Sequence, residues 1–290
     1  LYAAHHINGQ PQEKRLLPFR NIRHLLSMHA KTAGHRPYLI HIDGDGDREE
    51  YDYAEFNARV HQTANFLYDD LGVRRGDRVA VLGYNHAETV IIYFACWVVG
   101  AAVAPQNVAE DDQRIAFILR NSEAVVCLVR PEYLDRAQRI VHGDEADDEL
   151  GAANIREIVV YGGVEPIGEY KHFNTLVQNL PNTFLGDGAP VKSNDDAIYD
   201  DPDGVVPTLD DEALLVYTSG TTGAPKGVVL TQYNLMTDAL AISQAQAITG
   251  GQRMMCVLPI HHVNGIVVTL MTPLLVGAST VLNRQFSASR

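Results

Sequence analysis

Short apolar segments alternate with helical segments along most of this chain, and this alternation limits the folds that the chain can adopt. The apolar segments lack the polar alternation of a strand with one face in water, so we expect both faces of each strand to be covered. Strands of this kind, separated by helices, form parallel sheets with helices packed on them. The sequence therefore predicts an α/β fold with two lobes of mostly parallel β-sheet flanked by helices.

Hydrophobic periodicity and turn residues place the individual elements. Asp52 and Glu55 have capping-box spacing, which predicts a helix start, and Thr231 is suited to cap a later helix. Strands or extended segments are predicted at 38–42, 50–53, the end of 72–82, 101–104, 124–129, 213–217, 227–230, 254–258 and 278–282. Helices are predicted at 56–67, 91–99, 110–121, 231–248 and 266–276.

The turn at 43–47 reads Asp-Gly-Asp-Gly-Asp, and its acids suggest calcium. An EF-hand loop also needs glycine after the third aspartate and glutamate at its twelfth position. Arg48 and Ala54 occupy those positions, so we expect a solvated hairpin turn. The histidines have no metal-ligand spacing either, and no metal site is predicted.

Two acidic segments interrupt the alternation. Residues 144–149 hold five acids, and residues 195–212 hold eight acids and two prolines without a basic residue. Both are predicted to be solvated loops. We interpret 195–212 as a linker between a first α/β subdomain at 1–194 and the start of a second at 213–290.

The charge of the chain excludes some partners. The formal net charge is −13, whereas a general nucleic-acid binder needs a basic face, so no nucleic-acid partner is expected. Residues 263–282 are uncharged and long enough to span a membrane. Asn264, Gly265 and Pro273 divide them into helix, turn and strand, so no membrane span is expected.

The cysteines favour a reducing compartment. Cys96, Cys127 and Cys256 are far apart in apolar surroundings and form no Cys-x-x-Cys pair, which predicts buried thiols. The first residues do not show the pattern of a secretory signal peptide, which is a basic segment followed by an apolar segment and a cleavage site. We therefore expect a cytoplasmic protein.

The segment at 218–227 has the chemistry of a phosphate-binding loop and directly follows a predicted strand. Its glycines let backbone N–H groups approach an anion, its hydroxyls donate hydrogen bonds, and its lysine adds a mobile positive charge. It is not a Walker A loop, because two residues separate the last loop glycine from the lysine and another glycine follows. The candidate phosphate contacts are Thr218, Ser219, Gly220, Thr221, Thr222, Gly223, Lys226 and Gly227.

The string Tyr217-Thr-Ser-Gly-Thr-Thr-Gly-Ala-Pro-Lys-Gly227 resembles the phosphate-loop signature of the adenylate-forming enzymes. This family includes acyl-CoA synthetases, aryl-CoA ligases, luciferases and peptide-synthetase adenylation domains. Residues 75–80, Asn85 and residues 104–107 are also similar to the family's N-terminal lobe. The resemblance extends from about Ile22 to Arg290 and is weakest at 143–211.

A second motif, Leu258-Pro-Ile-His-His-Val-Asn-Gly265, resembles a histidine motif that ends a strand in acyl- and aryl-CoA synthetases. His262 falls on the family's histidine, which lies by the carboxylate site, and His261 replaces the usual aromatic residue. The resemblance implies that His262 is catalytic and that His261, His262, Asn264 and Gly265 contact the substrate. The alternative is a histidine pair that only caps the end of a strand.

The same region bears on the class of substrate. The family's amino-acid-activating domains place an aspartate near this motif to pair with the substrate amine. Between Glu212 and Arg290 the only acid is Asp238, which lies in the preceding predicted helix. A plain carboxylate is therefore expected.

The resemblance implies that the enzyme activates a carboxylic acid with ATP as acyl-AMP and then forms a thioester with CoA. ATP, Mg²⁺ and CoA are the implied cofactors and co-substrates. The resemblance does not identify the acid, and it leaves open whether CoA or a carrier protein accepts the acyl group. Family members continue with a segment that binds adenine and Mg²⁺ and a mobile C-terminal domain with a catalytic lysine. We expect this chain to be inactive without that C-terminal part.

Two other functions compete with this one. A non-catalytic nucleotide-binding or assembly module derived from the family is the alternative, and the sequence after Arg290 would separate the two. A dinucleotide-binding oxidoreductase would need Gly-x-Gly-x-x-Gly after an early strand, and the chain has none.

Overall fold

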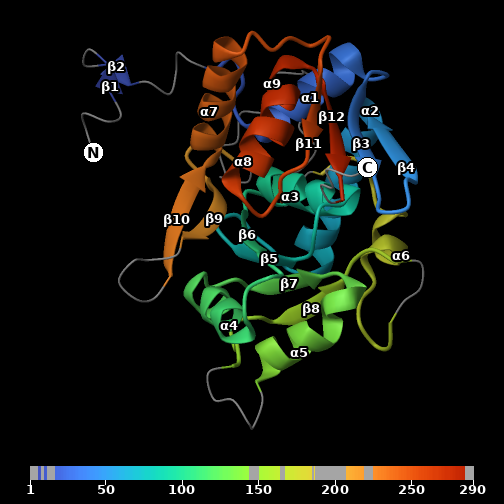
Figure 1. Ribbon diagram of the computed structural model, residues 1–290, viewed down its shortest axis with the longest axis vertical. Helices are drawn as coiled ribbons and strands as arrows, with labels where there is room; N and C mark the ends of the chain where they lie inside the picture. The colour runs from blue at the N-terminus through green and yellow to red at the C-terminus, as the bar shows by residue number, and fades with distance from the viewer. Residues whose placement is uncertain are drawn as a thin grey trace.

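The computed structural model describes residues 17–143, 150–163, 167–184, 186, 207–218 and 225–284. It also describes the backbone of two short paired strands, β1 (His6–Ile7) and β2 (Gln10–Pro11). Two larger sheets with helices around them make up the main body (Figure 1).

The larger sheet has the strand order β10-β9-β6-β5-β7-β8. Its neighbouring strands run parallel, except that β10 is antiparallel to β9. The strands are β5 (Arg78–Leu82), β6 (Ala102–Gln106), β7 (Val126–Val129), β8 (Glu157–Val160), β9 (Glu212–Thr218) and β10 (Lys226–Thr231).

The smaller sheet has the order β11-β12-β3-β4, with β4 antiparallel to β3 and the other pairs parallel. Its strands are β3 (Pro37–Ile42), β4 (Arg48–Asp52), β11 (Arg253–Cys256) and β12 (Ser279–Asn283). The prediction of mostly parallel sheets flanked by helices is confirmed, and each sheet carries one antiparallel edge strand.

Helices fill the space between the two sheets (Figure 1). The central one, α3 (Ala87–Val99), has every side chain buried, which explains why its sequence is apolar all round. The other helices of this core are α1 (Ile22–Ala33), α2 (Tyr53–Asn65) with a π-helical turn at Phe66–Asp70, α7 (Gln232–Ala245), α8 (Val263–Ile266) with a π-helical turn at Val267–Met271, and α9 (Thr272–Val276).

A second layer covers the other face of the larger sheet. It contains α4 (Asp112–Asn121), a 3₁₀ turn at Pro131–Tyr133 and α5 (Leu134–His142), while α6 (Phe173–Val177) packs with the main core. In β5, Val79 and Val81 face the core between the sheets, and Ala80 and Leu82 face α4 and α5. Because both faces are covered, the strand has no polar alternation, as expected.

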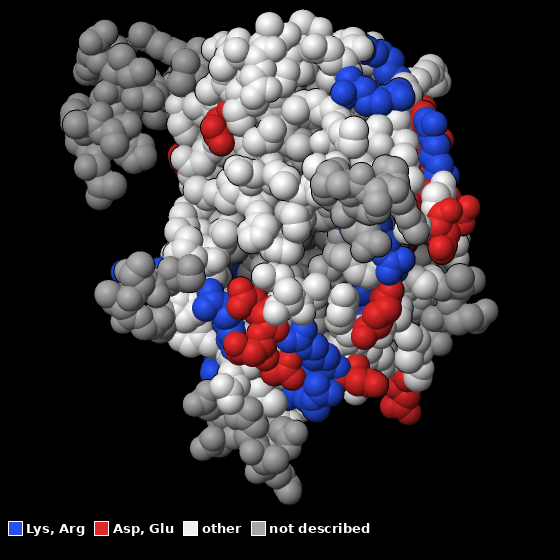
Figure 2. Space-filling view, viewed as in Figure 1, with Lys and Arg blue, Asp and Glu red and all other residues white. Residues whose placement is uncertain are grey.

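Charged side chains gather over α4 and α5, whereas the surface over α7, α8 and α9 is nearly free of them (Figure 2). Arg136 and Arg139 of α5 both pair with Asp112 of α4. These pairs, which are still partly in contact with water, link the two helices and add little net stabilisation.

Most element predictions are confirmed to within a few residues. Asp52 and Glu55 form a reciprocal capping box at α2, and Thr231 and Asn234 form another at α7. The last helix before β11 ends at Ala245, three residues earlier than expected. The elements α1, α5, α6 and β8 were not predicted from the sequence.

The acidic turn closes the β3–β4 hairpin, as predicted. The carboxylate of Asp43 accepts backbone N–H bonds from Asp45, Gly46 and Asp47 at 2.8–3.0 Å. A carboxylate at the first position of a turn satisfies local backbone donors in this way.

Each sheet takes strands from both sides of the predicted linker. β9 and β10 extend the larger sheet beside β6, and β3 and β4 extend the smaller sheet beside β12. Each sheet therefore contains strands from before and after 195–212. The division into a first subdomain at 1–194, a linker at 195–212 and the start of a second subdomain at 213–290 stays a prediction.

The described end of the acidic linker, 207–212, is held by ion pairs at Asp211 and Glu212. The Arg75 guanidinium donates to the Asp211 carboxylate at 2.8–3.0 Å, and the Arg78 guanidinium donates to Glu212 at 2.8 Å. The expectation of a solvated loop therefore holds for Asp210, which is exposed, but not for Asp211, which has an arginine partner far away in sequence. The other acidic segment, 144–149, lies outside the described residues.

The cysteine prediction is confirmed, since Cys96, Cys127 and Cys256 are all buried free thiols. Burial raises the pKa of Cys127 to about 12, so this thiol stays protonated at neutral pH. Among the described residues, every helix is too short or too polar to cross a bilayer.

Candidate active site

A pocket of about 700 Å³ opens where the parallel strands of both sheets end. Its described lining comes from the residues after β5, β6, β7, β11 and β12. The lining residues are Gly83, Tyr84, Asn85, Asn107, Val108, Ala109, Glu132, Tyr133, Val257, Pro259, His261, His262 and Arg284. Ligands of α/β proteins bind at this edge, because the loops that follow the strands converge there.

The predicted histidine pair lies in this pocket. Nε2 of His261 and Nε2 of His262 are 3.1 Å apart, and the ring centroids are 4.2 Å apart. Burial, and then the neighbouring His262, lower the pKa of His261 to about 4. His261 is therefore neutral at physiological pH, and one ring donates the hydrogen bond that the other accepts.

The other two predicted substrate contacts are placed differently. Asn264 is exposed and Gly265 is buried, and neither belongs to the described lining. A Cβ atom at position 265 would lie 2.5 Å from the carbonyl oxygen of Pro259. Gly265 thus allows the start of α8 to pack against the chain that carries the histidines, and its contact with substrate stays a prediction.

Asn85 joins this histidine segment to both sheets. Its side-chain Nδ2 donates to the carbonyl oxygens of Leu258 at 2.9 Å and Asn283 at 3.0 Å, and its Oδ1 accepts the Ile260 N–H at 2.8 Å. The side chain is 4% exposed. In the sequence Asn85 stands out only as part of the resemblance, because these contacts are 173–198 residues away.

The phosphate loop is held at its two ends by the β9–β10 hairpin. Thr218 lies opposite Lys226 and Tyr217 lies opposite Gly227 in the antiparallel register. Because β9 is parallel to β6, the loop leaves the sheet at the edge where the pocket lies. Ser219, Gly220, Thr221, Thr222 and Gly223 lie outside the described residues.

Lys226 and Gly227 begin β10. The Lys226 side chain is exposed, and no ion pair holds it within the described part of the chain. A Cβ atom at position 227 would lie 3.1 Å from the Tyr217 ring, which leaves little space for any residue larger than glycine. Phosphate binding by these residues stays a prediction.

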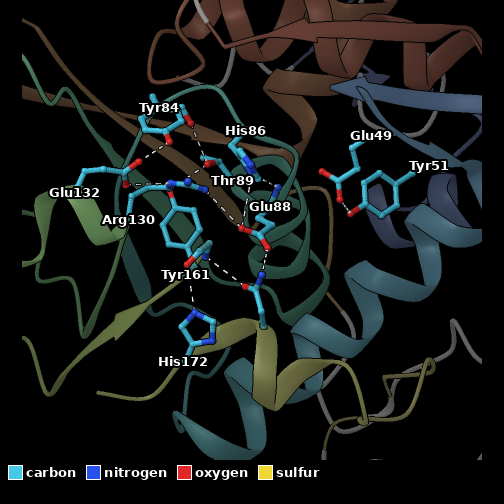
Figure 3. Close-up of polar contacts among 12 residues, drawn as sticks. Glu49, Tyr51, Tyr84, His86, Glu88, Thr89, Arg130, Glu132, Tyr161 and His172 are labelled. Atoms are coloured by element: carbon cyan, nitrogen blue, oxygen red, sulfur yellow. Dashed lines mark hydrogen bonds and ion pairs between the residues drawn. The ribbon is translucent and has the colours of Figure 1, made fainter. Parts of the chain in front are cut away.

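One wall of the pocket contains Tyr84 and Glu132, with Arg130 packed behind them (Figure 3). The Tyr84 hydroxyl donates to Glu132 at 2.7 Å, and the Arg130 and Arg284 guanidinium carbons lie 4.7 and 4.4 Å from the centroid of the Tyr84 ring. Burial, followed by the bond to Glu132, raises the pKa of Tyr84 to about 12.

Behind this wall, Arg130 is 7% exposed and lies between two carboxylates. Its NH1 is 3.7 Å from Glu88, and its Nε is 3.6 Å from Glu132 (Figure 3). Burial raises the pKa of Glu88, and the Arg130 charge acts in the opposite direction. A buried guanidinium needs such partners, because its charge is costly without them.

The pocket offers few ligands for magnesium. Mg²⁺ is held by carboxylates, waters and substrate phosphates. Glu132 is the one carboxylate in the described lining, and it already accepts the Tyr84 bond and faces Arg130. The described pocket residues therefore do not fit a protein-held Mg²⁺.

Comparison with known proteins identifies the family. The model of the AMP-binding enzyme family matches residues 26–290. This chain belongs to that family. The match includes the phosphate-loop and histidine motifs, and the resemblance noted from the sequence is confirmed.

Curated relatives of this AMP-binding chain are acyl-CoA ligases. Crotonobetaine/carnitine–CoA ligases of Escherichia coli O17:K52:H18 (strain UMN026) and Shigella dysenteriae serotype 1 (strain Sd197) are each 28% identical over 269 residues. The alignments cover 93% of this chain and 47% of each relative. The chain thus spans about half the length of these relatives.

Solved structures support the same fold. An anthranilate CoA ligase in complex with anthranoyl-AMP matches with a TM-score of 0.74 and 24% identity over 93% of this chain and 46% of its own. A long-chain-fatty-acid CoA ligase homologue from Rhodopseudomonas palustris CGA009 matches with a TM-score of 0.73 and 21% identity over 93% of this chain and 59% of its own.

Proposed function

We propose that this chain is the N-terminal part of an acid–thiol ligase that activates a carboxylic acid as acyl-AMP and then transfers the acyl group to CoA. The observation that carries the proposal is that the signature loop leaves the sheet at the same edge as the His261–His262 pocket. A triphosphate on the loop and a carboxylate in the pocket would then lie at one edge of the sheet.

In the first step, a carboxylate oxygen attacks the α-phosphorus of ATP, the bond to the β-phosphate breaks, and pyrophosphate leaves. Both reactants are anions, so the protein must position them and offset their repulsion. The backbone N–H groups and hydroxyls at 218–223, with Lys226, are suited to hold the β- and γ-phosphates.

The histidines are suited to hold the carboxylate. A neutral imidazole can donate one N–H bond to a carboxylate oxygen. His262 takes this role in the proposal, with His261 as the hydrogen-bonded neighbour that sets its orientation. In the second step the CoA thiol loses its proton and attacks the acyl carbonyl, the bond from that carbon to the phosphate oxygen breaks, and AMP leaves. The described pocket residues do not provide a magnesium site, and no step is assigned to that ion.

The proposal is tested by pyrophosphate exchange into ATP, measured with the protein that contains this chain and the part that follows it. The carboxylate panel should include carnitine, crotonobetaine, anthranilate and a long-chain fatty acid, because the relatives' names point to these classes. Acid-dependent exchange is expected for at least one of them. ATP binding without exchange for any acid would favour the non-catalytic module instead.

Two further measurements sharpen this test. His262→Ala should raise the KM for the acid while leaving the KM for ATP close to wild type, and the exposed His35→Ala is the matched control. The 290-residue chain alone should show no exchange, because the resemblance places the adenine-binding segment and catalytic lysine beyond it. Exchange by this chain alone would contradict the expected inactivity.

A further inference from the structure

A cluster of two histidines and one glutamate lies beside the N-terminus of α3. His41 of β3, Glu49 of β4 and His86 before α3 each place one ligand-type atom within 4.8 Å of the other two. In the β3–β4 register, His41 pairs directly with Glu49, so their side chains share one face of the hairpin. The His86 ring centroid is 4.5 Å from that of His41.

The His41 ring has a buried nitrogen that is available to bind a metal ion. The residue is 3% exposed, and its Nε2 has no hydrogen-bond partner among the described residues. Burial lowers the pKa of His41 below its usual value, although the Asn85 backbone acts on the ring in the opposite direction. A neutral imidazole keeps one ring nitrogen with a free lone pair, which is the form that binds metals.

We propose that His41, Glu49 and His86 bind a divalent transition-metal ion of the zinc class. Two imidazole nitrogens and one carboxylate favour Zn²⁺ or Co²⁺ over Mg²⁺ and Ca²⁺, which prefer oxygen ligands. The site is therefore chemically distinct from any ion that accompanies ATP, and it does not depend on the proposed ligase activity.

Binding requires a small movement, which Glu49 can supply. Ligand atoms around a tetrahedral zinc ion are about 3.4 Å apart, so no pair of ligand atoms in the cluster must close by more than about 1.4 Å. Glu49 is exposed on the edge strand β4, and the Tyr51 hydroxyl donates to its carboxylate (Figure 3). An exposed side chain on an edge strand can rotate towards the two rings without disturbing the core.

The charged groups around the cluster have opposite effects on the binding of a cation. Arg130 lies near both rings and Arg284 lies near His86, and both repel a cation. The carboxylates of Glu49 and Asp43 act in the opposite direction. Burial and Arg130 lower the pKa of His86 to about 3, so the ring is neutral, which is the form that binds metals.

The test is Zn²⁺ titration by calorimetry, with the Co²⁺ absorption spectrum as a second readout. Glu49→Gln removes the carboxylate ligand from an exposed position, and Glu50→Gln is its matched control, because adjacent residues of a strand face opposite sides. Any Zn²⁺ bound elsewhere, for example at His261–His262, is common to both variants. We expect Glu49→Gln to weaken one Zn²⁺ site at least about tenfold, while Glu50→Gln matches wild type.

His86→Ser is the second variant. His86 caps α3 by accepting the Glu88 N–H, and serine is a favoured cap, so the helix should be retained while the ring is lost. This variant should lose the same Zn²⁺ site and the Zn²⁺-dependent rise in Tm, and excess Mg²⁺ should not compete in wild type. Equal Zn²⁺ affinity in Glu49→Gln, His86→Ser and Glu50→Gln would overturn the proposal. The free nitrogen of His41 would then be interpreted as a site for a hydrogen-bonded water molecule.

Discussion

The side-chain amide of Asn85 donates a 2.9 Å hydrogen bond to the carbonyl oxygen of Leu258 and so joins the end of β5 to the chain after β11. Its two other bonds reach Ile260 and Asn283. One buried amide therefore fixes the ends of strands from both sheets, directly before the histidine pair.

Asn85→Ala should destabilise the chain more than an ordinary polar deletion. The change leaves the buried Ile260 N–H without its acceptor, and it also removes the donor to the carbonyl oxygens of Leu258 and Asn283. A buried unsatisfied group costs about 1–3 kcal/mol, so we expect the free energy of unfolding to fall by about 3 kcal/mol in urea titrations. Asn264→Ala, an exposed asparagine nearby, should change it by less than about 0.5 kcal/mol.

His61 should make the stability of the chain depend on pH. Burial, followed by the Arg23 charge, lowers the pKa of His61 to about 3 from 6.5, so the folded ring stays neutral where the unfolded ring takes up a proton. Stability is therefore lost as pH falls below about 6.5, by up to about 1.4 kcal/mol per pH unit.

His61→Asn keeps an acceptor for the Phe184 N–H, which is 2.9 Å from Nδ1, and removes the titration. Between pH 6.5 and 4, this variant should lose less stability than wild type in urea titrations. His35→Asn changes a fully exposed histidine and is the control. Parallel wild-type and His61→Asn profiles would show that another group dominates the acid transition.

Gly83 is required by the packing of the pocket wall. A Cβ atom there would overlap the Tyr161 hydroxyl and lie 2.9 Å from Cγ of Arg130. Gly83→Ala should destabilise the chain by about 1–3 kcal/mol. Tyr161→Phe removes the overlapping oxygen, so the double variant should recover about 1 kcal/mol or more in a double-mutant cycle. Additive effects of the two changes would exclude this contact as the cause.

Much of the fold follows from local sequence. Val79 to Leu82 are apolar on both faces because helices cover both sides, and Asp52 and Glu55 mark the start of α2 by their own side chains. The antiparallel direction of β10 can also be predicted from the sequence, since a loop as short as 219–225 cannot make a parallel crossover. The pairing of β3 with β12 cannot be predicted from local sequence, because it joins segments about 240 residues apart in the chain.

The site was predictable only in part. The two motifs mark Thr218, Lys226 and the histidine pair in the sequence, and each motif follows a predicted strand, where ligands of α/β folds bind. The contacts of Asn85, and the approach of His86 to His41, join segments that are distant in the chain, and sequence spacing carries no signal for them. The same limit explains why Asp211, which pairs with Arg75, was expected to be solvated.

Lys226 gives the sharpest test of the phosphate loop. Its side chain is exposed at the start of β10 and has no ion pair among the described residues, so Lys226→Ala should change the free energy of unfolding by less than about 0.5 kcal/mol. In the protein that includes the following part, pyrophosphate exchange should fall by about 100-fold, because the proposal assigns Lys226 the positive charge that offsets the leaving phosphates. Lys171→Ala is the matched control: it removes a surface ion pair with Glu157 on β8, at the other edge of the sheet, and should leave exchange unchanged. Exchange at the wild-type rate in Lys226→Ala would mean that the loop binds phosphate without its lysine.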